Sequence, residues 1–267
     1  MMDRYKYVFV VLVYKNIDVL RDFFQSLHIL DYKVIVVNSY YDDFSLKECQ
    51  DVAIANNAVF IPIENKGYGY GNNVGTKYAI EHYEYDYLIL SNSDIHVYDM
   101  KALDKLKDNT AVIAPYTHLP RGKVQNPNIP WRINCLFGLL KKAYDTDSRI
   151  RFAIPHIMTR LSREFFKVYK LVVRKDFYRI YSCHGSFIIF TKKAVDRLSP
   201  FFDDRMFLYN EELYLAENCR IKHVPVFYCP KIDVLHLEGA SSGHHLGFER
   251  NKESFSIFYS WMKEKKY

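Results

Sequence analysis

The sequence lacks the hallmarks of several large protein classes. Its 267 residues include five cysteines, an odd number, and no two of them have the Cys-x-x-Cys spacing. This usage argues against a disulfide framework and against a structural zinc site. No apolar run approaches the roughly 20 residues that a membrane-spanning helix needs, and the short run 8–13 does not have the form of a signal peptide. We therefore expect a cytoplasmic protein in a reducing compartment.

Motifs that identify common nucleotide-binding and nucleic-acid-binding proteins are also missing. The sequence contains no G-x-x-x-x-G-K-[ST] motif, and Gly67-x-Gly69-x-Gly71 differs from the G-x-G-x-x-G fingerprint. The 23 tyrosines and the basic residues form no aromatic–basic RNA motif. We expect no nucleic-acid partner.

Strand and helix signals alternate through the N-terminal part of the chain. Continuous apolar runs are typical of strands buried on both faces, and the segments between them carry apolar residues at helical spacing. The predicted strands cover 7–14, 33–37, 59–63 and 87–91, and the predicted helices cover 19–27, 46–56 and a segment that follows the loop 64–75 and ends near residue 83. This order predicts a mainly parallel sheet with right-handed crossovers, which binds ligands at the carboxyl ends of its strands.

Four polar features follow in chain order, and each has an ordinary explanation when taken alone. Asp94, at the tip of the fourth strand, suits a metal ligand or a turn residue. The glycine-rich stretch 64–75 allows close backbone approaches or forms a plain turn. Glu211 and Glu212 could supply a general base or only a favourable charge at a helix start. His236 ends an apolar strand, where a histidine is more often a hydrogen-bonded core residue than a metal ligand.

Taken in order, these motifs resemble those of glycosyltransferase family 2, in particular its rhamnosyltransferase-like members. The glycine-rich loop closely matches the family pattern Asn-x-Gly-Phe-x-x-x-Asn-Asn-x-Gly, and the tip of the fourth strand looks like the family's metal motif in an Asn-x-Asp form. The resemblance covers 8–97 and 182–242. It is carried by the segments 11–16, 36–43, 65–75, 90–94, 185–187 and 207–212, and by His236 with Gly239 and Ser241.

The resemblance implies a GT-A-type fold, with a mixed, mainly parallel sheet flanked by helices, a helical basic insertion and a C-terminal helix. It implies an inverting transfer of a hexosyl or rhamnosyl group from a dTDP- or UDP-linked sugar to a hydroxyl of a glycan or lipid-linked acceptor, in bacterial surface polysaccharide synthesis. Asp94 and His236 would bind a divalent metal, Mn²⁺ or Mg²⁺, and Glu212, with Glu211 as the alternative, would be the base. The donor would contact Val13, Tyr14, Asn38, Asp43, Lys66, Gly67, Gly69, Asn73, Asn92 and Ser93.

Two departures from the family pattern bear on these assignments. Asn38 replaces the aspartate that usually meets the nucleotide base, which leaves the base specificity open. Glu212 replaces the usual aspartate and moves the carboxylate out by one methylene.

Length and charge suggest one domain, 1–267, with a nucleotide-sugar-binding half at 1–114 and an acceptor-binding half at 115–267. The net charge is +6, and 141–179 alone carries +7 from eleven Lys/Arg and four Asp/Glu. Within this basic helical segment, 141–180, apolar and basic residues keep helical spacing on opposite faces. The basic face would either meet an anionic membrane surface, at the inner face of the plasma membrane, or be the solvated face of a helix packed on the core.

Two other function classes stay open. A non-catalytic nucleotide-sugar- or glycan-binding homologue would leave Glu212 dispensable. A sugar-phosphate nucleotidyltransferase shares the α/β layout, but it should carry a glycine-rich loop with Arg or Lys after the first strand, and 14–17 is unlike such a loop.

Overall fold

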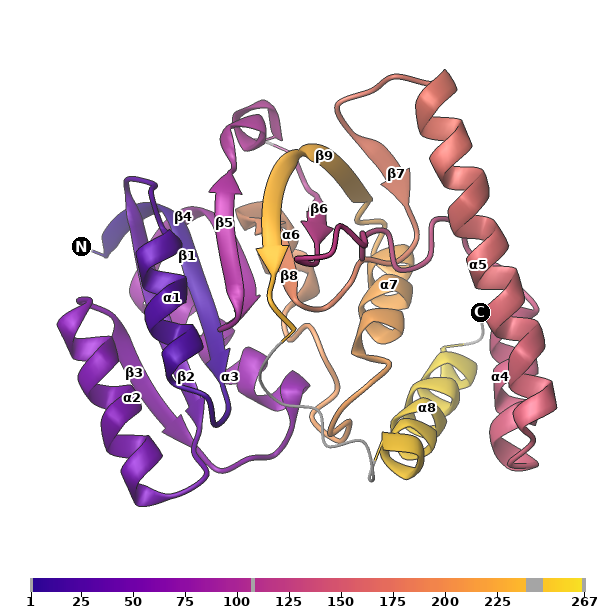
Figure 1. The fold of residues 1–267 in the computed structure, drawn as a ribbon, viewed down its shortest axis with the longest axis horizontal. Coiled ribbons are helices and arrows are strands. Elements are labelled where there is room, and N and C mark those ends of the chain that lie inside the picture. The colour runs from indigo at the N-terminus through magenta and orange to yellow at the C-terminus, as the bar shows by residue number, and fades with distance from the viewer. Residues whose placement is uncertain (1, 107–108, 239–246, 266–267) are drawn as a thin grey trace.

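The computed structural model describes residues 2–106, 109–238 and 247–265, and it has an α/β architecture (Figure 1). Within these ranges one nine-stranded sheet has the order β3-β2-β1-β4-β8-β6-β9-β5, and β7 pairs with β9. The strands are β1 (Asp3–Val13), β2 (Tyr32–Ser39), β3 (Val59–Ile63), β4 (Tyr83–Asn92), β5 (Ile95–Asp99), β6 (Val112–His118), β7 (Tyr178–Ile180), β8 (Phe187–Thr191) and β9 (Val226–His236). The helices are α1 (Asp18–Ser26), α2 (Asp43–Ala55), α3 (Tyr68–His82), the 3₁₀ helix η1 (Lys101–Leu106), α4 (Leu136–Asp145), α5 (Arg149–Val172), α6 (Lys192–Leu198), α7 (Glu211–Ile221) and α8 (Gly247–Glu264).

The sheet is mixed, and its longer ladders are parallel, as the sequence predicts. β1 runs parallel to β2 and β4, β2 runs parallel to β3, and β6 runs parallel to β9. β8 lies antiparallel between β4 and β6, and β5 and β7 are antiparallel to β9. The carboxyl ends of β1, β2 and β4 therefore meet at one edge of the sheet, which is where ligands are expected.

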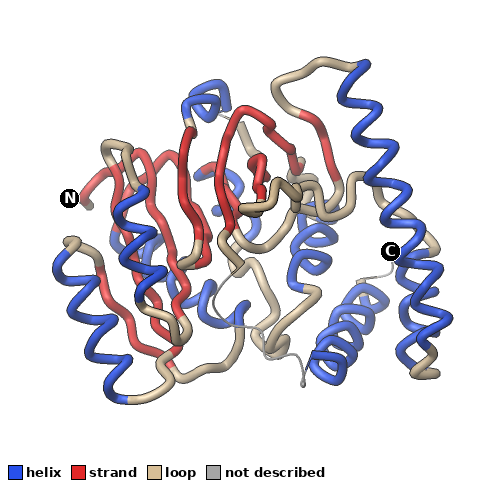
Figure 2. The backbone as a smooth tube through the Cα atoms, in the orientation of Figure 1, coloured by secondary structure: helices blue, strands red, loops and turns tan. Residues whose placement is uncertain are grey.

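Helices cover both faces of the sheet, as Figure 2 shows. Phe9 and Val11 of β1 belong to a buried cluster with α1 and α2, whereas Val8 and Val10 belong to a second cluster with α3, α6 and α7. Successive side chains of a strand point to opposite faces, so a strand with both faces covered has no position for a polar side chain. This burial explains why β1 is read from the sequence as a continuous apolar run.

Several elements differ from the sequence prediction. The sequence pattern predicts strands at 221–229 and 232–236, but Ile221 ends α7, and a single strand, β9, runs from Val226 to His236. The ladder of β9 with β6 shifts register between Cys229 and Asp233. Such an irregularity accommodates Pro230, which cannot donate to a ladder. The predicted loop 64–75 is already helical from Tyr68, and β5, α4 and β7 were not predicted. The proposed division at residue 114 falls inside β6, and it stays a prediction.

Helix α5 packs on the protein through the face that carries Phe166 and Arg163, and it leaves its apolar face exposed. Phe166 contacts the rings of Trp131, Tyr178 and Tyr228, and Arg163 donates to Asn128 O at 2.8 Å. Of the apolar residues with helical spacing in this segment, Met158 is partly exposed, and the other six are 52–76% exposed: Ile154, Ile157, Leu161, Phe165, Val168 and Val172. These six, together with Ile150 and Leu171, which are 83% and 76% exposed, we call the outer face of α5.

Of the two alternatives for this helix, the one in which its apolar face packs on the core is therefore wrong for α5. Periodicity separates the two faces of a helix, but it does not say which face the rest of the chain covers. No helix in the described ranges is long and apolar enough to span a membrane.

Candidate active site

The register of two strands brings Asp94 and His236 together. β4 ends at Asn92, and β5 begins at Ile95 after two intervening residues. β5 runs antiparallel to β9 with Ile95 opposite His236, and Leu237 N–H donates to Asp94 O at 2.9 Å. Two residues that are distant in the sequence thus lie side by side.

The side chains of Asp94 and His236 face each other directly. Asp94 Oδ1 lies 3.2 Å from His236 Nε2, and each side chain is 8% exposed. On the other side of the ring, His236 Nδ1 lies 2.8 Å from Gln125 Oε1, and Gln125 Nε2 donates to Glu238 Oε1 at 3.0 Å. Because a carboxylate only accepts, Gln125 turns its oxygen toward the histidine, and the histidine donates from Nδ1.

This tautomer favours a positive charge between Asp94 and His236. A neutral imidazole that donates from Nδ1 presents the Nε2 lone pair to the carboxylate, and the two repel unless a proton or a cation lies between them. Neighbouring ligands of an octahedral Mg²⁺, each about 2.1 Å from the ion, are about 3 Å apart. The 3.2 Å separation therefore fits a shared divalent ion.

The pair could supply only part of a coordination shell. Over the described ranges, no group of three or more His, Cys, Asp or Glu side chains is arranged to hold a metal. A hard divalent cation often keeps several waters and binds substrate phosphates in addition to one or two carboxylates. The remaining ligands would then be water and substrate oxygens.

Glu212 is held against the segment that precedes β8. Gly185 N–H donates to Glu212 Oε1 at 3.2 Å, and Tyr68 O–H donates to Gly185 O at 2.5 Å. A Cβ at position 185 would lie 3.0 Å from the same Oε1 atom, so glycine leaves room for the carboxylate. Burial raises the pKa of Glu212, although backbone hydrogen bonds oppose the shift. The next residue, Ser186, accepts through its O from Asn92 N–H at 2.9 Å, so one segment contacts both Glu212 and the end of β4.

Glu211, the first residue of α7, is less exposed to solvent than Glu212. It is 3% exposed, and its Oε1 has no hydrogen-bond partner among the described residues. Burial, and then the charge of Glu212, raises the pKa of Glu211 to about 8. Glu211 therefore carries its proton at neutral pH and cannot accept another one there.

The predicted donor-binding residues at the strand ends form a row. Val13 pairs with Asn38 between β1 and β2, and Leu12 pairs with Asn92 between β1 and β4. Asn38 and Ser93 are buried, and Asn38 Nδ2 has no hydrogen-bond partner among the described residues.

Three other predicted donor-binding residues lie farther out on the surface. Tyr14 follows β1, and its ring meets that of Tyr41 edge-on at 6.4 Å. Asp43 begins α2 and is exposed. Lys66 follows β3, is exposed, and holds its Nζ 5.3 Å from the centroid of the Tyr70 ring.

The glycines of the predicted loop are required by packing. Gly67 has φ +107°, and a Cβ there would lie 2.2 Å from Phe207 O. Tyr68 N–H donates to the same Phe207 O at 2.9 Å, so the start of α3 is attached to the segment that leads into α7. A Cβ on Gly69 would lie 2.9 Å from Phe202 Cβ.

Asn73, predicted to bind the donor, uses its amide within the chain. Its Nδ2 donates to Phe202 O and Asp204 Oδ1, and its Oδ1 accepts from Phe201 N–H and Phe202 N–H. The side chain thereby positions the loop 201–204 against α3. Its role in donor binding stays a prediction.

Sequence reasoning missed Gln125, His184 and Tyr68. His184 Nδ1 accepts from Ser186 N–H at 3.2 Å, and its ring centroid lies 5.9 Å from that of His236. Burial, followed by the charges of neighbouring groups, lowers the pKa of His184 to about 4. The histidine directly before Gly185-Ser186 is a signal that could have been used, whereas Gln125 lies in an irregular loop and gives none. Gly239 and Ser241 of the late histidine motif lie outside the described residues.

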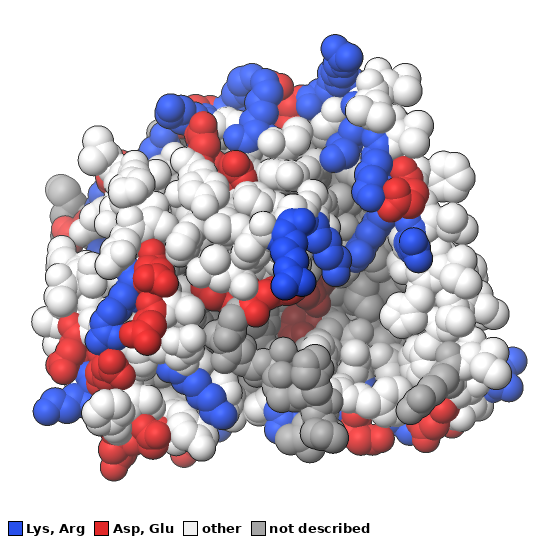
Figure 3. Space-filling view, in the orientation of Figure 1, with Lys and Arg blue, Asp and Glu red and all other residues white. Residues whose placement is uncertain are grey.

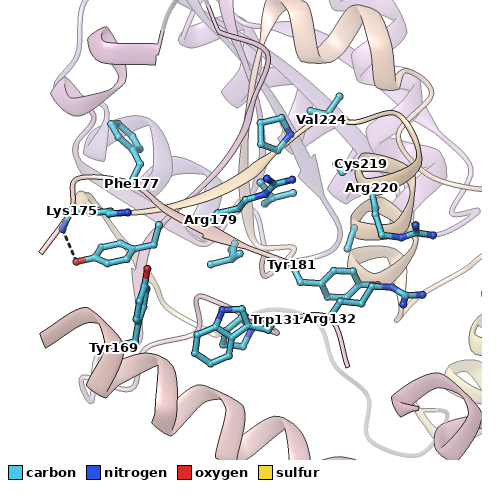
Figure 4. A pocket seen from close by; sticks show the side chains of 16 residues that line it. Trp131, Arg132, Tyr169, Lys175, Phe177, Arg179, Tyr181, Cys219, Arg220 and Val224 are labelled. Atoms are coloured by element: carbon cyan, nitrogen blue, oxygen red, sulfur yellow. Dashed lines mark hydrogen bonds between the residues drawn. The ribbon is translucent and has the colours of Figure 1, made fainter. Parts of the chain in front are cut away.

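A separate cavity of about 470 Å³ lies at the other end of α7, and no predicted site residue lines it. Figure 4 shows Trp131, Arg132, Tyr169, Arg179 and Arg220 around it. The buried Glu217 accepts from Arg132, Tyr181 and Arg220. Burial would raise the pKa of Glu217, but these hydrogen bonds outweigh it and hold the pKa below its usual value. This network fixes the wall of the cavity, away from Asp94.

Comparisons with known proteins support the architecture. No family model matches the chain, and no curated protein matches it. The structure of GalNAc-T7 with UDP, GalNAc and Mn²⁺ superposes with a TM-score of 0.62 at 10% sequence identity, over 98% of this chain and 50% of that one. The structure of S. aureus TarS gives a TM-score of 0.50 at 13% identity, over 84% of this chain and 36% of that one.

The chain has the GT-A fold. This confirms the predicted fold class, a mixed, mainly parallel sheet flanked by helices with a C-terminal helix. The chain spans half of GalNAc-T7 and about a third of TarS. At these identities the likeness concerns the fold alone.

Proposed function

We propose that this chain is an inverting glycosyltransferase that moves a sugar from a nucleoside-diphosphate sugar to a hydroxyl group. The observation that carries the proposal is the arrangement of Asp94, His236 and Glu212. The first two form a buried pair at the strand ends, and Glu212 is a half-buried carboxylate held by the segment that also contacts the end of β4. One end of the sheet thereby offers both a site for a cation and a base.

Glu212 acts as the general base in this proposal. It removes the proton of the acceptor hydroxyl as that oxygen attacks the anomeric carbon from the face opposite the nucleotide, so the configuration inverts. The pKa of Glu211, about 8, leaves that residue protonated at neutral pH, which favours Glu212 over Glu211. Gly185 N–H and Tyr68 fix the position of the base.

Asp94 and His236 would hold the divalent ion, and Gln125 would orient the histidine. A bound Mn²⁺ or Mg²⁺ would supply positive charge to the diphosphate of the leaving nucleotide. GalNAc-T7 was solved with UDP, GalNAc and Mn²⁺, which supports a metal and a nucleoside-diphosphate donor for a chain of the same fold. The donor would extend from this pair along Asn92, Ser93, Val13 and Asn38.

Of the remaining residues predicted to bind the donor, three would contact it directly and three would only position the segments around it. Tyr14, Asp43 and Lys66 would contact the nucleotide from the rim. Gly67, Gly69 and Asn73 would act through the start of α3 and the loops packed against it. The donor would be dTDP- or UDP-linked, and the acceptor a glycan or a lipid-linked glycan bound by 115–267.

A donor screen tests the proposal. The full chain is incubated with UDP- and dTDP-sugars, with and without Mn²⁺, and donor binding is measured by calorimetry and donor hydrolysis by nucleotide release. We expect binding of at least one donor that requires Mn²⁺ in the wild type and is lost in Asp94→Ala. Binding that is independent of the metal and equal in Asp94→Ala would contradict the assigned metal site. The absence of any donor turnover together with retained binding would favour a non-catalytic homologue.

A further inference from the structure

The outer face of α5 is a largely apolar surface, interrupted by the exposed Glu164, that the described residues do not cover. Its eight residues are 52–83% exposed, and at 100° per residue they fall within an arc of about 120°. The opposite face of α5 already contacts the protein through Phe166 and Arg163. Monomeric proteins rarely expose a contiguous apolar patch of this kind, which marks an interaction surface.

Cations border this surface. Arg160 and Lys167 lie along one edge of it and Arg151 along the other, and all three are exposed. Lys167 Nζ lies 2.7 Å from Glu164 Oε1 in a solvent-exposed ion pair, which contributes little to stability. Arg174 and Lys175, also exposed, follow the end of the helix. Figure 3 shows a mostly white margin along α5, with Lys and Arg gathered at its upper part. The α5 sequence contains six Lys/Arg and one Asp/Glu, Glu164.

These charges distinguish between the two kinds of partner that could cover an apolar helix. A two-fold dimer would place the outer face of α5 against its own copy, which brings together two helices that each carry six Lys/Arg and only one acidic residue, Glu164. An anionic lipid surface complements both features, because it accepts apolar side chains between the headgroups and attracts the flanking cations.

We propose that α5 lies in the plane of an anionic lipid surface, with its outer face between the headgroups. Ile154, Leu161 and Phe165 reach the acyl boundary, while Arg160 and Lys167 pair with lipid phosphates. α5 is a peripheral docking element, in keeping with the lack of a spanning helix among the described residues. This docking does not depend on the sugar transfer, although it would bring a lipid-linked acceptor to the protein.

Vesicle flotation of the full chain tests the docking. The vesicles consist of phosphatidylcholine alone or of equal parts phosphatidylcholine and phosphatidylglycerol. The double variant Leu161→Glu/Phe165→Glu places charges in the outer face. The matched control Leu30→Glu/Ile54→Glu changes two exposed apolar residues elsewhere and adds the same charge. Circular dichroism verifies that all variants are folded.

We expect the wild type and the control to float with the anionic vesicles, and the α5 variant to partition at least about tenfold more weakly. Arg160→Gln/Lys167→Gln should reduce the preference for anionic over neutral vesicles. Equal flotation of the wild type and the α5 variant would overturn the proposal. So would a dimer, seen by light scattering without vesicles, that dissociates in the α5 variant while flotation is unchanged.

Discussion

In the candidate active site, side chains that usually stay in water are buried, whereas along α5 side chains that are usually buried are exposed. Asp94, His236 and Glu211 are each less than a tenth exposed. Phe165 of α5 is 67% exposed, yet its neighbour Phe166 is 1% exposed. Both regions depart from the ordinary distribution of residues, in opposite directions.

The two regions differ in how the cost of these unusual environments is offset. A buried polar group is costly unless it is hydrogen-bonded, and the site provides such bonds from distant segments, as Gln125 does for His236 and Gly185 does for Glu212. The exposed apolar face of α5 has no such contacts from the described residues. In our proposals, a small ligand would complete the site, whereas a lipid surface would cover α5.

The largest expected effect comes from removing the base. Glu212→Gln keeps the size of the side chain but cannot take a proton, so kcat should fall about 10²- to 10⁴-fold while donor binding is retained. Steady-state transfer assays and calorimetry measure the two quantities. Glu81→Gln, on the exposed face of α3, should behave like the wild type. Normal turnover in Glu212→Gln would transfer the role to Glu211.

Two adjacent phenylalanines test the contrast within α5. Phe166→Ala should lower the free energy of unfolding by about 3–5 kcal/mol, because it opens a cavity among packed rings. Phe165→Ala should change it by less than about 0.5 kcal/mol, because the side chain is in water. Denaturant unfolding of both variants gives the comparison. Similar losses in both would mean that the outer face of α5 is covered within the protein.

A smaller effect is expected from the residue that orients His236. Gln125→Leu removes the acceptor for Nδ1–H, and loss of such a hydrogen bond typically lowers metal affinity or activity about 10–100-fold. Calorimetric titration with Mn²⁺ measures the affinity, and the melting temperature serves as the control for folding. Unchanged Mn²⁺ affinity in this variant would argue that Gln125 does not select the tautomer.

The last expected effect concerns the pH dependence of stability. The folded protein holds a proton on Glu211 up to a pKa of about 8, whereas the ordinary value is 4.5. Over this interval the folded state binds more protons than the unfolded one, so this residue makes stability fall as pH rises. Glu211→Gln should be more stable than the wild type at pH 9 and similar to it near pH 4, with a change in Tm of about 2–4 °C per kcal/mol. If the melting temperatures of both proteins changed with pH in the same way, the raised pKa of the buried Glu211 carboxyl would be contradicted.

The sequence was a good guide to the regular part of the fold. The strand predicted at 59–63 coincides with β3, and the apolar runs at 7–14 and 33–37 fall on β1 and β2. The central parts of β1 and β2 are buried on both faces, so the type of every side chain there carries the signal, whereas β3 lies at the edge of the sheet and is only partly buried. Short elements such as β5 and β7 carry too few residues for a periodic pattern, and both were missed.

The candidate site was predictable only in part. Asp94, His236 and Glu212 could be named from motifs in order, and the strand ends that hold Asn38 and Asn92 followed from the alternation of elements. The contacts of Gln125 and Tyr68 could not, because each depends on the approach of a segment far away in the chain. The glycines of 64–75 could be singled out because glycine allows close backbone approaches, but the residues that approach them, such as Phe207, are known only from the fold.

By itself the sequence determined that this chain builds an alternating α/β sheet, that polar residues end its strands, and that its basic segment contains an amphipathic helix. These properties are local, since they depend on residue type and spacing along the chain. The tertiary structure alone decided that Asp94 lies against His236, because the register of β5 and β9 is set by pairing between distant strands. It alone decided that α5 turns its apolar face outward, because a helix with two faces is oriented by what the rest of the chain offers to pack against.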